Sequence, residues 1–150
     1  MKHIKERLHS HCMQYATARI ERIRQEITEA QVAANEEVKS SAGDKHETGR
    51  AMAQLEVEKN AQLLHEAEKL KAVMETIPAN RTSETVTPGS LVITSDGVFY
   101  IAISIGKAEV EGMPYLIISA ESPIGMALSG KKKGDEITWN NRRYVIEEVR

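Results

Sequence analysis

Apolar residues in the first half of the chain recur at steps of three and four residues, the spacing of one face of an α-helix. The pattern runs from Ile4 to Val38 and then again from Met52 to Ile77. The apolar positions are Ile4, Leu8, Tyr15, Ile23, Ile27, Ala30, Ala34 and Val38 in the first segment, and Met52, Leu55, Leu63, Ala67, Leu70, Met74 and Ile77 in the second. Each helix would thus carry a stripe of apolar residues along one face. Neither helix can bury its apolar stripe alone, so we expect the two to pack as an antiparallel hairpin.

A turn is predicted between the two helices, at residues 40–44, which read Ser-Ser-Ala-Gly-Asp. Gly43 suits the end of the first helix, because glycine adopts the left-handed conformation of a helix C-terminal cap without strain. A helix of ~35–40 residues that rises ~1.5 Å per residue is a rod of ~50–60 Å. We therefore expect the tip, near residues 43–49, to stand far from the rest of the protein.

The pattern changes at Ile77-Pro78. No proline precedes this point, and Ala, Glu, Gln, Lys and Arg, which favour helices, dominate. Residues 78–88 are polar with a proline at each end, and beyond them Val, Ile and Thr come in short bursts between turn signals. The predicted strands are 91–94, 98–103, 116–119, 136–139 and 143–146, with turns at 95–97 and 140–141.

One segment of this second half departs from the strand pattern. Ser122 suits a helix N-cap and Pro123 the first helical position, so residues 122–128 predict a short helix laid across the sheet. The expected fold class is α+β. It comprises a helical hairpin or coiled coil over residues 1–77, a linker over 78–88, and an antiparallel β domain with one short helix over 89–150.

Composition narrows the range of functions. Aromatic residues make up only 4% of the chain, which argues against a large aromatic pocket. The single cysteine, Cys12, rules out an intrachain disulfide and a cysteine-based zinc cluster. Charges interrupt the first seven residues, and no apolar run approaches the ~20 residues of a membrane helix. We expect a cytoplasmic protein without a membrane partner.

Two carboxylates lie at the predicted hairpin tip. Asp44 and Glu47 are three residues apart at the start of the second helix, a spacing that puts both on one helical face. Such a pair can hold Mg²⁺, which accepts one or two carboxylates and keeps several waters, and a metal held in this way can activate water. The same spacing is also that of a capping box, which stabilises a helix start. The two interpretations are compatible.

Two other features remain open from the residues alone. The apolar residues of segment 122–128 either fill the core or form a docking patch for another protein, and Lys131–Lys133 form either a solvated turn or a contact with phosphates or acidic protein. The basic residues of the first helix either contact a nucleic-acid backbone or form its solvated outer face. They are Lys2, Lys5, Arg7, Arg19, Arg22 and Arg24.

Two motifs in this sequence resemble those of the Gre transcript cleavage factors (GreA/GreB). Residues 122–135 read Ser-Pro-Ile-Gly-Met-Ala-Leu-Ser-Gly-Lys-Lys-Lys-Gly-Asp, which looks like the hallmark of the C-terminal domain in that family. The tip, Gly43-Asp44-x-x-Glu47, resembles the tip of the family's coiled coil. The resemblance covers nearly the whole chain and implies an FKBP-like C-terminal domain.

The resemblance also implies a partner and a role. The partner would be RNA polymerase, with Ser122, Pro123, Ile124 and Gly125 in the contact region at the rim of the secondary channel. The hairpin would enter the channel, and Asp44 and Glu47 would complete a Mg²⁺ site beside the RNA 3′ end, so that backtracked RNA is cleaved. The factor would have no active site of its own, and no cofactor in the free state.

The tip departs from the family pattern after Glu47. Gre tips usually continue Asn-Ala-Glu-Tyr, whereas this chain continues Thr48-Gly49-Arg50-Ala51. An alternative is therefore a factor that occupies the channel without stimulating cleavage. A third hypothesis is a peptidyl-prolyl isomerase, suggested by the FKBP-like domain and opposed by the scarcity of aromatic residues.

Overall fold

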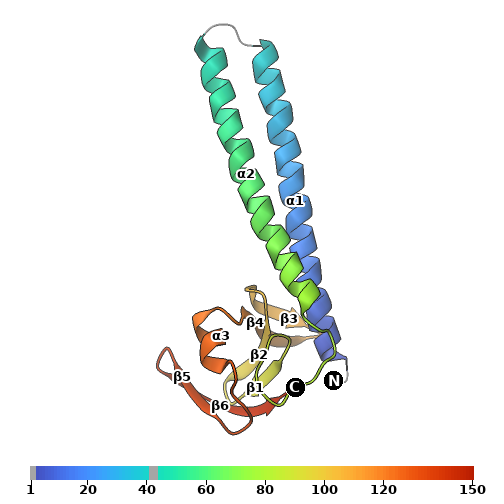
Figure 1. Ribbon diagram of the computed structural model, residues 1–150, viewed down its shortest axis with the longest axis vertical. Coiled ribbons are helices and arrows are strands. Elements are labelled where there is room, and N and C mark those ends of the chain that lie inside the picture. The colour runs from blue at the N-terminus through green and yellow to red at the C-terminus, as the bar shows by residue number, and fades with distance from the viewer. Residues whose placement is uncertain (1–2, 41–43) are drawn as a thin grey trace. The chain divides into compact units, whose positions relative to one another are not determined.

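The protein combines a helical hairpin with a β-rich part that contains one short helix (Figure 1). The computed structural model describes residues 3–40 and 44–150, and the side chains of residues 3–36 and 48–150. Helix α1 spans Ile4–Ser40 and α2 spans Asp44–Thr76. This order confirms the α+β class and the predicted pair of long helices. None of the described helices is both long enough and apolar enough to cross a membrane.

Contacts divide the chain into two compact units. One contains residues 15–71, and the other contains residues 1–14 together with 72–150. The first unit has a small core in which Ile20, Ile23 and Ala67 are buried, with Ile27, Leu63 and Leu64 packed against them. The buried positions of α2 include Asn60, Ala67 and Met74, which lie seven residues apart, the repeat of a coiled-coil seam. Arg24 and Glu68 form an exposed ion pair of 3.8 Å across the two helices.

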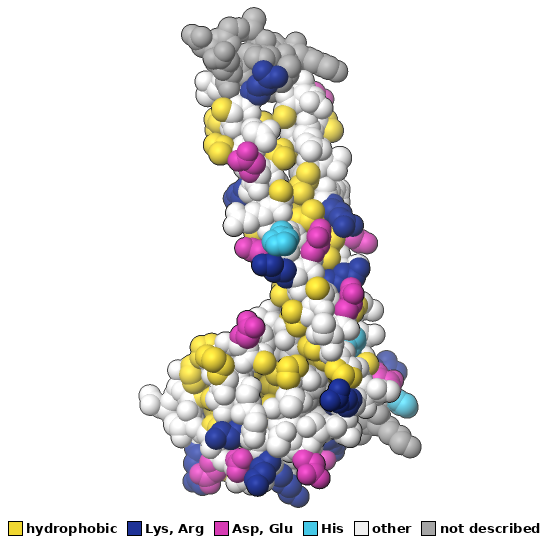
Figure 2. Space-filling model, viewed as in Figure 1, with side chains coloured by type: hydrophobic (Ala, Val, Ile, Leu, Met, Phe, Trp, Pro, Cys, Tyr) yellow, Lys and Arg dark blue, Asp and Glu magenta, His cyan; other side chains and the backbone are white. Residues whose placement is uncertain are grey.

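The prediction that the apolar stripe is buried is wrong at two positions of α2. Met52 and Leu55 are exposed, as is Val32 of α1, and Figure 2 shows apolar side chains on the hairpin surface interleaved with charged ones. The half-buried residues in this region are Ala53 and Val57, which line a cavity between α1 and α2. The α2 face turned toward α1 therefore carries small residues, and the larger side chains one or two positions away from it remain in solvent.

The sheet has six strands in the order β3-β4-β2-β1-β6-β5. The pair β2–β4 is parallel and the other four pairs are antiparallel. The strands are β1 (Leu91–Thr94), β2 (Gly97–Ala102), β3 (Gly106–Val110), β4 (Met113–Ser119), β5 (Glu136–Trp139) and β6 (Arg142–Val149), and the short helix α3 (Pro123–Leu128) lies between β4 and β5. The five predicted strands and the short helix are thus confirmed. Positive φ angles at Asn140 and Asn141 match the predicted turn between β5 and β6.

Sequence patterns did not predict β3. This edge strand reads Gly-Lys-Ala-Glu-Val, with only one β-branched residue, and its side chains are mostly exposed or half-buried. Charged residues such as Lys107 and Glu109 are typical of edge strands, because they discourage pairing with another chain. The same charges remove the apolar alternation by which a strand is predicted.

Segment 78–88 contributes to the β core. Val86 is 1% exposed within the cluster formed by the sheet and α3. Its amide donates to the carbonyl of Lys131 (2.8 Å), and its carbonyl accepts from the amide of Gly130 (2.9 Å). In the same core, the rings of Phe99 and Tyr144 meet edge to face with centroids 5.6 Å apart. The end of the predicted linker therefore packs into the core and is hydrogen-bonded to the loop after α3.

The first turns of α1 contact the segment that follows α2. His9 lies 3.0 Å from the carbonyl oxygen of Met74 and 2.9 Å from that of Ile77, measured from Nε2. Carbonyl oxygens only accept, so Nε2 carries the proton and donates to both. Arg7 pairs with Glu111 at 2.6 Å, while Leu8 and Cys12 are fully buried. These contacts make the base of α1 part of the same compact unit as the sheet.

Candidate functional site

Helix α3 begins with the predicted cap. Ser122 has extended backbone angles (φ −66°, ψ 156°), and its hydroxyl accepts from the amide of Gly125 at 3.1 Å. The same hydroxyl donates to the carbonyl of Ser119 at 2.7 Å, which ties the helix to the end of β4. Pro123 occupies the start of the helix, where a backbone N–H would have no acceptor within the helix, so proline costs no hydrogen bond. The Ser122 hydroxyl thus both donates and accepts a hydrogen bond within the protein.

Two of the predicted partner-binding residues face the interior. Ile124 is buried in the core cluster beneath the sheet, together with Leu128. Gly125 is also buried, and a Cβ atom at this position would lie only 2.0 Å from the carbonyl oxygen of Ser119. Glycine is therefore required for the close approach of α3 to the end of β4. Ile124 and Gly125 hold the helix in place, and both are buried from solvent.

The outer face of α3 carries two apolar side chains. Pro123 is exposed and Met126, three residues later on the same helical face, is 63% exposed. A methionine so exposed on a short, well-packed helix is a feature of adaptable protein-binding surfaces. We define the docking patch as Pro123 and Met126. Sequence analysis did not single out Met126 as exposed, although its i+3 spacing from Pro123 is visible in the sequence.

The loop after α3 is shaped by its own backbone. Gly130 and Gly134 have positive φ angles of 77° and 94°, which glycine adopts without strain. The carboxylate of Asp135 accepts from the amide of Lys132 at 2.9 Å, and the amide of Gly134 donates to the carbonyl of Ile146. Lys131, Lys132 and Lys133 are exposed on this loop. Most of the 122–135 motif therefore encodes the shape of the helix and loop.

The hairpin tip is described in part. Helix α2 begins at Asp44, so Asp44 and Glu47 occupy helical positions three residues apart. Gly43 lies outside the described residues, and the side chains of Asp44 and Glu47 also lie outside what the structure describes. Further along, Arg50 is exposed. In the described part of the chain, no group of three or more His, Cys, Asp and Glu residues has the arrangement of a metal site.

Several basic residues of α1 have partners within the protein. Lys5 is buried and donates to the main-chain oxygen of Arg81, and Arg7 and Arg24 form the ion pairs with Glu111 and Glu68. The two ion pairs offset the charges of Arg7 and Arg24, and burial keeps Lys5 away from the outer surface of the helix.

Part of the chain matches a known protein family. Residues 103–150 match the family described as transcription elongation factor, GreA/GreB, C-term. The matched region contains α3, the docking patch and the loop after it. A comparison with curated proteins finds no match.

The fold and this match describe a helical hairpin followed by a β-rich part, and the end of that part is similar to transcription elongation factors. More narrowly, residues 103–150 are similar to the C-terminal domain of the GreA/GreB factors. RNA polymerase is the partner that this family implies.

Proposed function

We propose that this protein binds RNA polymerase through the face of its β-rich part that carries the docking patch, and that its hairpin tip enters the secondary channel. There it stimulates cleavage of backtracked RNA. The observation that carries the proposal is the coincidence of the docking patch with the region that matches the family. Pro123 and Met126 are held by a helix whose opposite face is locked into the core, so the patch is rigid before binding.

The proposed chemistry belongs to the polymerase active site. Asp44 and Glu47 would supply carboxylate oxygens, the ligands that Mg²⁺ prefers, and a Mg²⁺ so held makes water a stronger nucleophile toward a phosphodiester. The factor lends ligands without being an enzyme by itself, and it would work near the RNA 3′ end. Lys131–Lys133 could add salt-sensitive contacts with phosphates or acidic protein. Such a factor acts where the polymerase acts, in the cytoplasm.

A second function uses the same surfaces without cleavage. The residues after Glu47 include Gly49, which weakens a helix interior by ~1 kcal/mol relative to alanine, and the exposed cation Arg50. A positive charge at this tip favours contact with RNA or acidic residues and opposes binding of a second cation. In this alternative the protein occupies the channel and inhibits or modulates the enzyme.

A prolyl isomerase is the weakest candidate. Isomerase sites require an apolar, aromatic cavity. The only Phe of the sequence, Phe99, is buried in the core, and the only Trp, Trp139, packs against that core half-buried. Neither lines the four cavities formed by residues 3–14, 31–57, 76–88 and their neighbours.

The deciding experiment uses a backtracked elongation complex of the host polymerase and RNA labelled at the 5′ end. Wild-type protein is expected to shorten the RNA, and the double variant Asp44→Ala/Glu47→Ala is expected to bind without shortening it. Glu56→Ala/Glu66→Ala, which removes two exposed carboxylates further along α2, is the matched control and should cleave normally. If the wild-type protein binds and inhibits the polymerase without shortening the RNA, the second function is established. If it does not bind the polymerase, both functions are rejected.

A further inference from the structure

A pocket outside the proposed polymerase-binding surfaces lies beside the first turn of α1. It has a volume of about 320 Å³, roughly ten times the ~30 Å³ share of one water molecule. The residues that line it are Ile4, Lys5, Glu6, Ala79, Asn80, Thr82 and Arg150. All belong to one compact unit, residues 1–14 and 72–150. Neither residue of the docking patch is among them.

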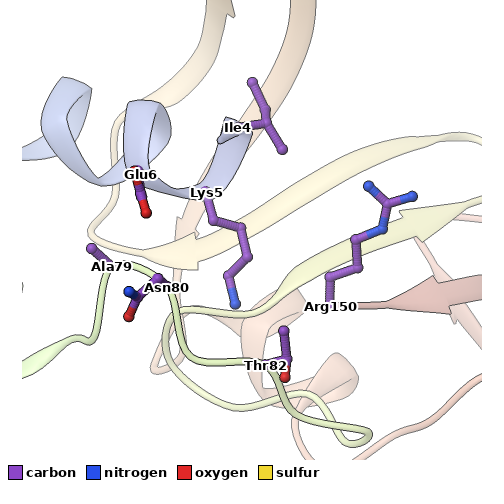
Figure 3. Close-up of a pocket in the computed structure, with 7 residues that line it drawn as sticks. All are labelled: Ile4, Lys5, Glu6, Ala79, Asn80, Thr82 and Arg150. Atoms are coloured by element: carbon purple, nitrogen blue, oxygen red, sulfur yellow. The ribbon is translucent and has the colours of Figure 1, made fainter. Parts of the chain in front are cut away.

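Lys5 is the unusual member of this set. Its side chain extends from α1 toward the loop that carries Asn80 and Thr82 (Figure 3), and the residue is only 8% exposed. Its ammonium donates to the main-chain oxygen of Arg81, which is a neutral acceptor. Among the described residues, no carboxylate forms an ion pair with it. Burial without a paired anion lowers the pKa of Lys5, because the charged form loses hydration.

The loop opposite Lys5 contains unused hydrogen-bonding groups. Within the described part of the chain, the side chains of Asn80 and Thr82 make no hydrogen bond, and the amides of residues 79–82 donate to no main-chain acceptor. Lys5 itself retains donors, since an ammonium has three N–H bonds and the Arg81 oxygen accepts one of them. Asn80 and Thr82 line the cavity together with Lys5, so hydrogen-bonding groups without a partner in the part of the chain that the structure describes lie around it.

Arg150 adds positive charge on the other side of the pocket. Its Nε and Nη2 atoms are bound to Glu148 at 2.7 and 3.1 Å, which leaves Nη1 as the remaining donor group. The carboxylate of Glu6 opposes an anion, but it is half exposed and 3.7 Å from His3. Two of the three charged side chains in the lining are cationic, and Lys5 has no anionic partner among the described residues, which favours a small anion over a cation.

We propose that this pocket binds a small oxyanion, of the phosphate or carboxylate type, between the Lys5 ammonium and the donors of loop 79–82. A planar or tetrahedral oxyanion offers several acceptor oxygens, which matches the several donors here. The bound anion pairs with the buried charge and links α1 to the segment between α2 and β1. The inference is independent of the proposed polymerase function.

The test measures anion binding by the full chain. Amide chemical shifts at residues 5 and 79–82, and the melting temperature, are followed as sodium phosphate or sodium acetate replaces sodium chloride at constant ionic strength. Saturable shifts at these amides and a rise in melting temperature are expected. Lys5→Met should weaken binding by about tenfold or more, the loss expected for a hydrogen bond from a charged group. Lys107→Met, which removes an exposed charge from β3 of the same unit, should bind normally.

A second variant keeps the test valid if Lys5→Met does not fold. Thr82→Val retains the charge, removes one exposed hydroxyl, and should weaken binding about threefold to tenfold. Phosphate binding without acetate binding assigns the site to phosphates, and the reverse assigns it to carboxylates. The proposal is overturned if neither anion gives saturable shifts at these residues, or if the substituted proteins bind as tightly as the wild type.

Discussion

Gly125 and Ser119 approach so closely that no side chain fits between them: a Cβ atom on Gly125 would lie 2.0 Å from the carbonyl oxygen of Ser119. This contact seats α3 on the end of β4. The Ser122 hydroxyl bonds both residues, donating to the Ser119 carbonyl and accepting from the Gly125 amide. The position of the docking patch therefore depends on a glycine that is itself buried.

Gly125→Ala should destabilise the β-rich part by about 1–3 kcal/mol or more, because the backbone atom it meets cannot rotate away. Urea unfolding followed by the fluorescence of Trp139 measures the loss. Met126→Ala, at the neighbouring exposed position, is the control and should leave the unfolding free energy within about 0.5 kcal/mol of wild type. Equal stability of Gly125→Ala and wild type would contradict the close packing.

Ile124 and Met126 are predicted to have opposite roles. Ile124→Ala removes a buried side chain from the core and should cost about 2–5 kcal/mol of stability. Met126→Ala should preserve stability and weaken polymerase binding, because truncation of an apolar residue matters most where a partner covers it. Urea unfolding and a binding titration with purified polymerase separate the two effects. Unchanged affinity of Met126→Ala would remove this residue from the docking patch.

The thiol of Cys12 should report opening at the base of α1. Cys12 is fully buried, and burial raises the pKa of its thiol from 9.0 to about 12, so the reactive thiolate is scarce at neutral pH. Labelling by a thiol reagent should therefore be slow until the helix base detaches. His9→Ala leaves the carbonyls of Met74 and Ile77 without their donor and should speed labelling by about tenfold or more.

His65→Ala is the control for this measurement. His65 is exposed on α2, in the other compact unit, and its removal should leave the labelling rate unchanged. Rapid labelling of the wild type in the absence of denaturant would show that the contacts of His9 do not limit access to Cys12.

The pair Glu136–Arg143 gives a prediction about pH. A hydrogen bond from the Arg143 guanidinium lowers the pKa of Glu136 below its ordinary value of 4.5. The folded state therefore binds a proton less readily than the unfolded state. The stabilisation is present above the unfolded pKa and is lost as the pH falls through the folded pKa. In Arg143→Gln, the carboxyl resonance of Glu136 should titrate at higher pH than in wild type.

Glu148 is the reference in the same titration. A hydrogen bond from Arg150 lowers the pKa of Glu148, so its carboxyl resonance should titrate at the same pH in the two proteins. An unchanged titration of Glu136 in Arg143→Gln would show that the pair is not formed in solution.

Helices and strands of this fold could be predicted where a single sequence signal, such as apolar spacing or a helix cap, is strong. Three- and four-residue apolar spacing indicated both helices, and the Ser122-Pro123 pair indicated α3. Predictions were wrong or missing where signals were weak. Around Ala53 and Val57 the inward face of α2 carries small residues, so the larger exposed Met52 and Leu55 were assigned to it instead. Val86 was assigned to a linker because its polar neighbours mask a single core residue.

The candidate site could be predicted from the sequence less completely than the fold. A conspicuous motif over residues 122–135 indicated a functional segment, but burial and backbone geometry account for Ser122, Ile124 and Gly125. The outward position of Met126 depends on how α3 is seated, which requires the tertiary structure. The roles of Asp44 and Glu47 come from a resemblance and depend on a metal held by another protein, so they remain predictions.

The assignment of residues 1–14 to the same compact unit as the sheet bears on how the molecule can be rebuilt. An engineer who exchanges tips between related factors would cut both helices, near residues 14 and 72, and leave the contacts of His9 intact. A graft at the proline after Ile77 would instead divide the contacts of Lys5 with Arg81 and of Arg7 with Glu111 between two parental sequences. A fragment begun at residue 89 would lack Val86 and leave its space in the core empty.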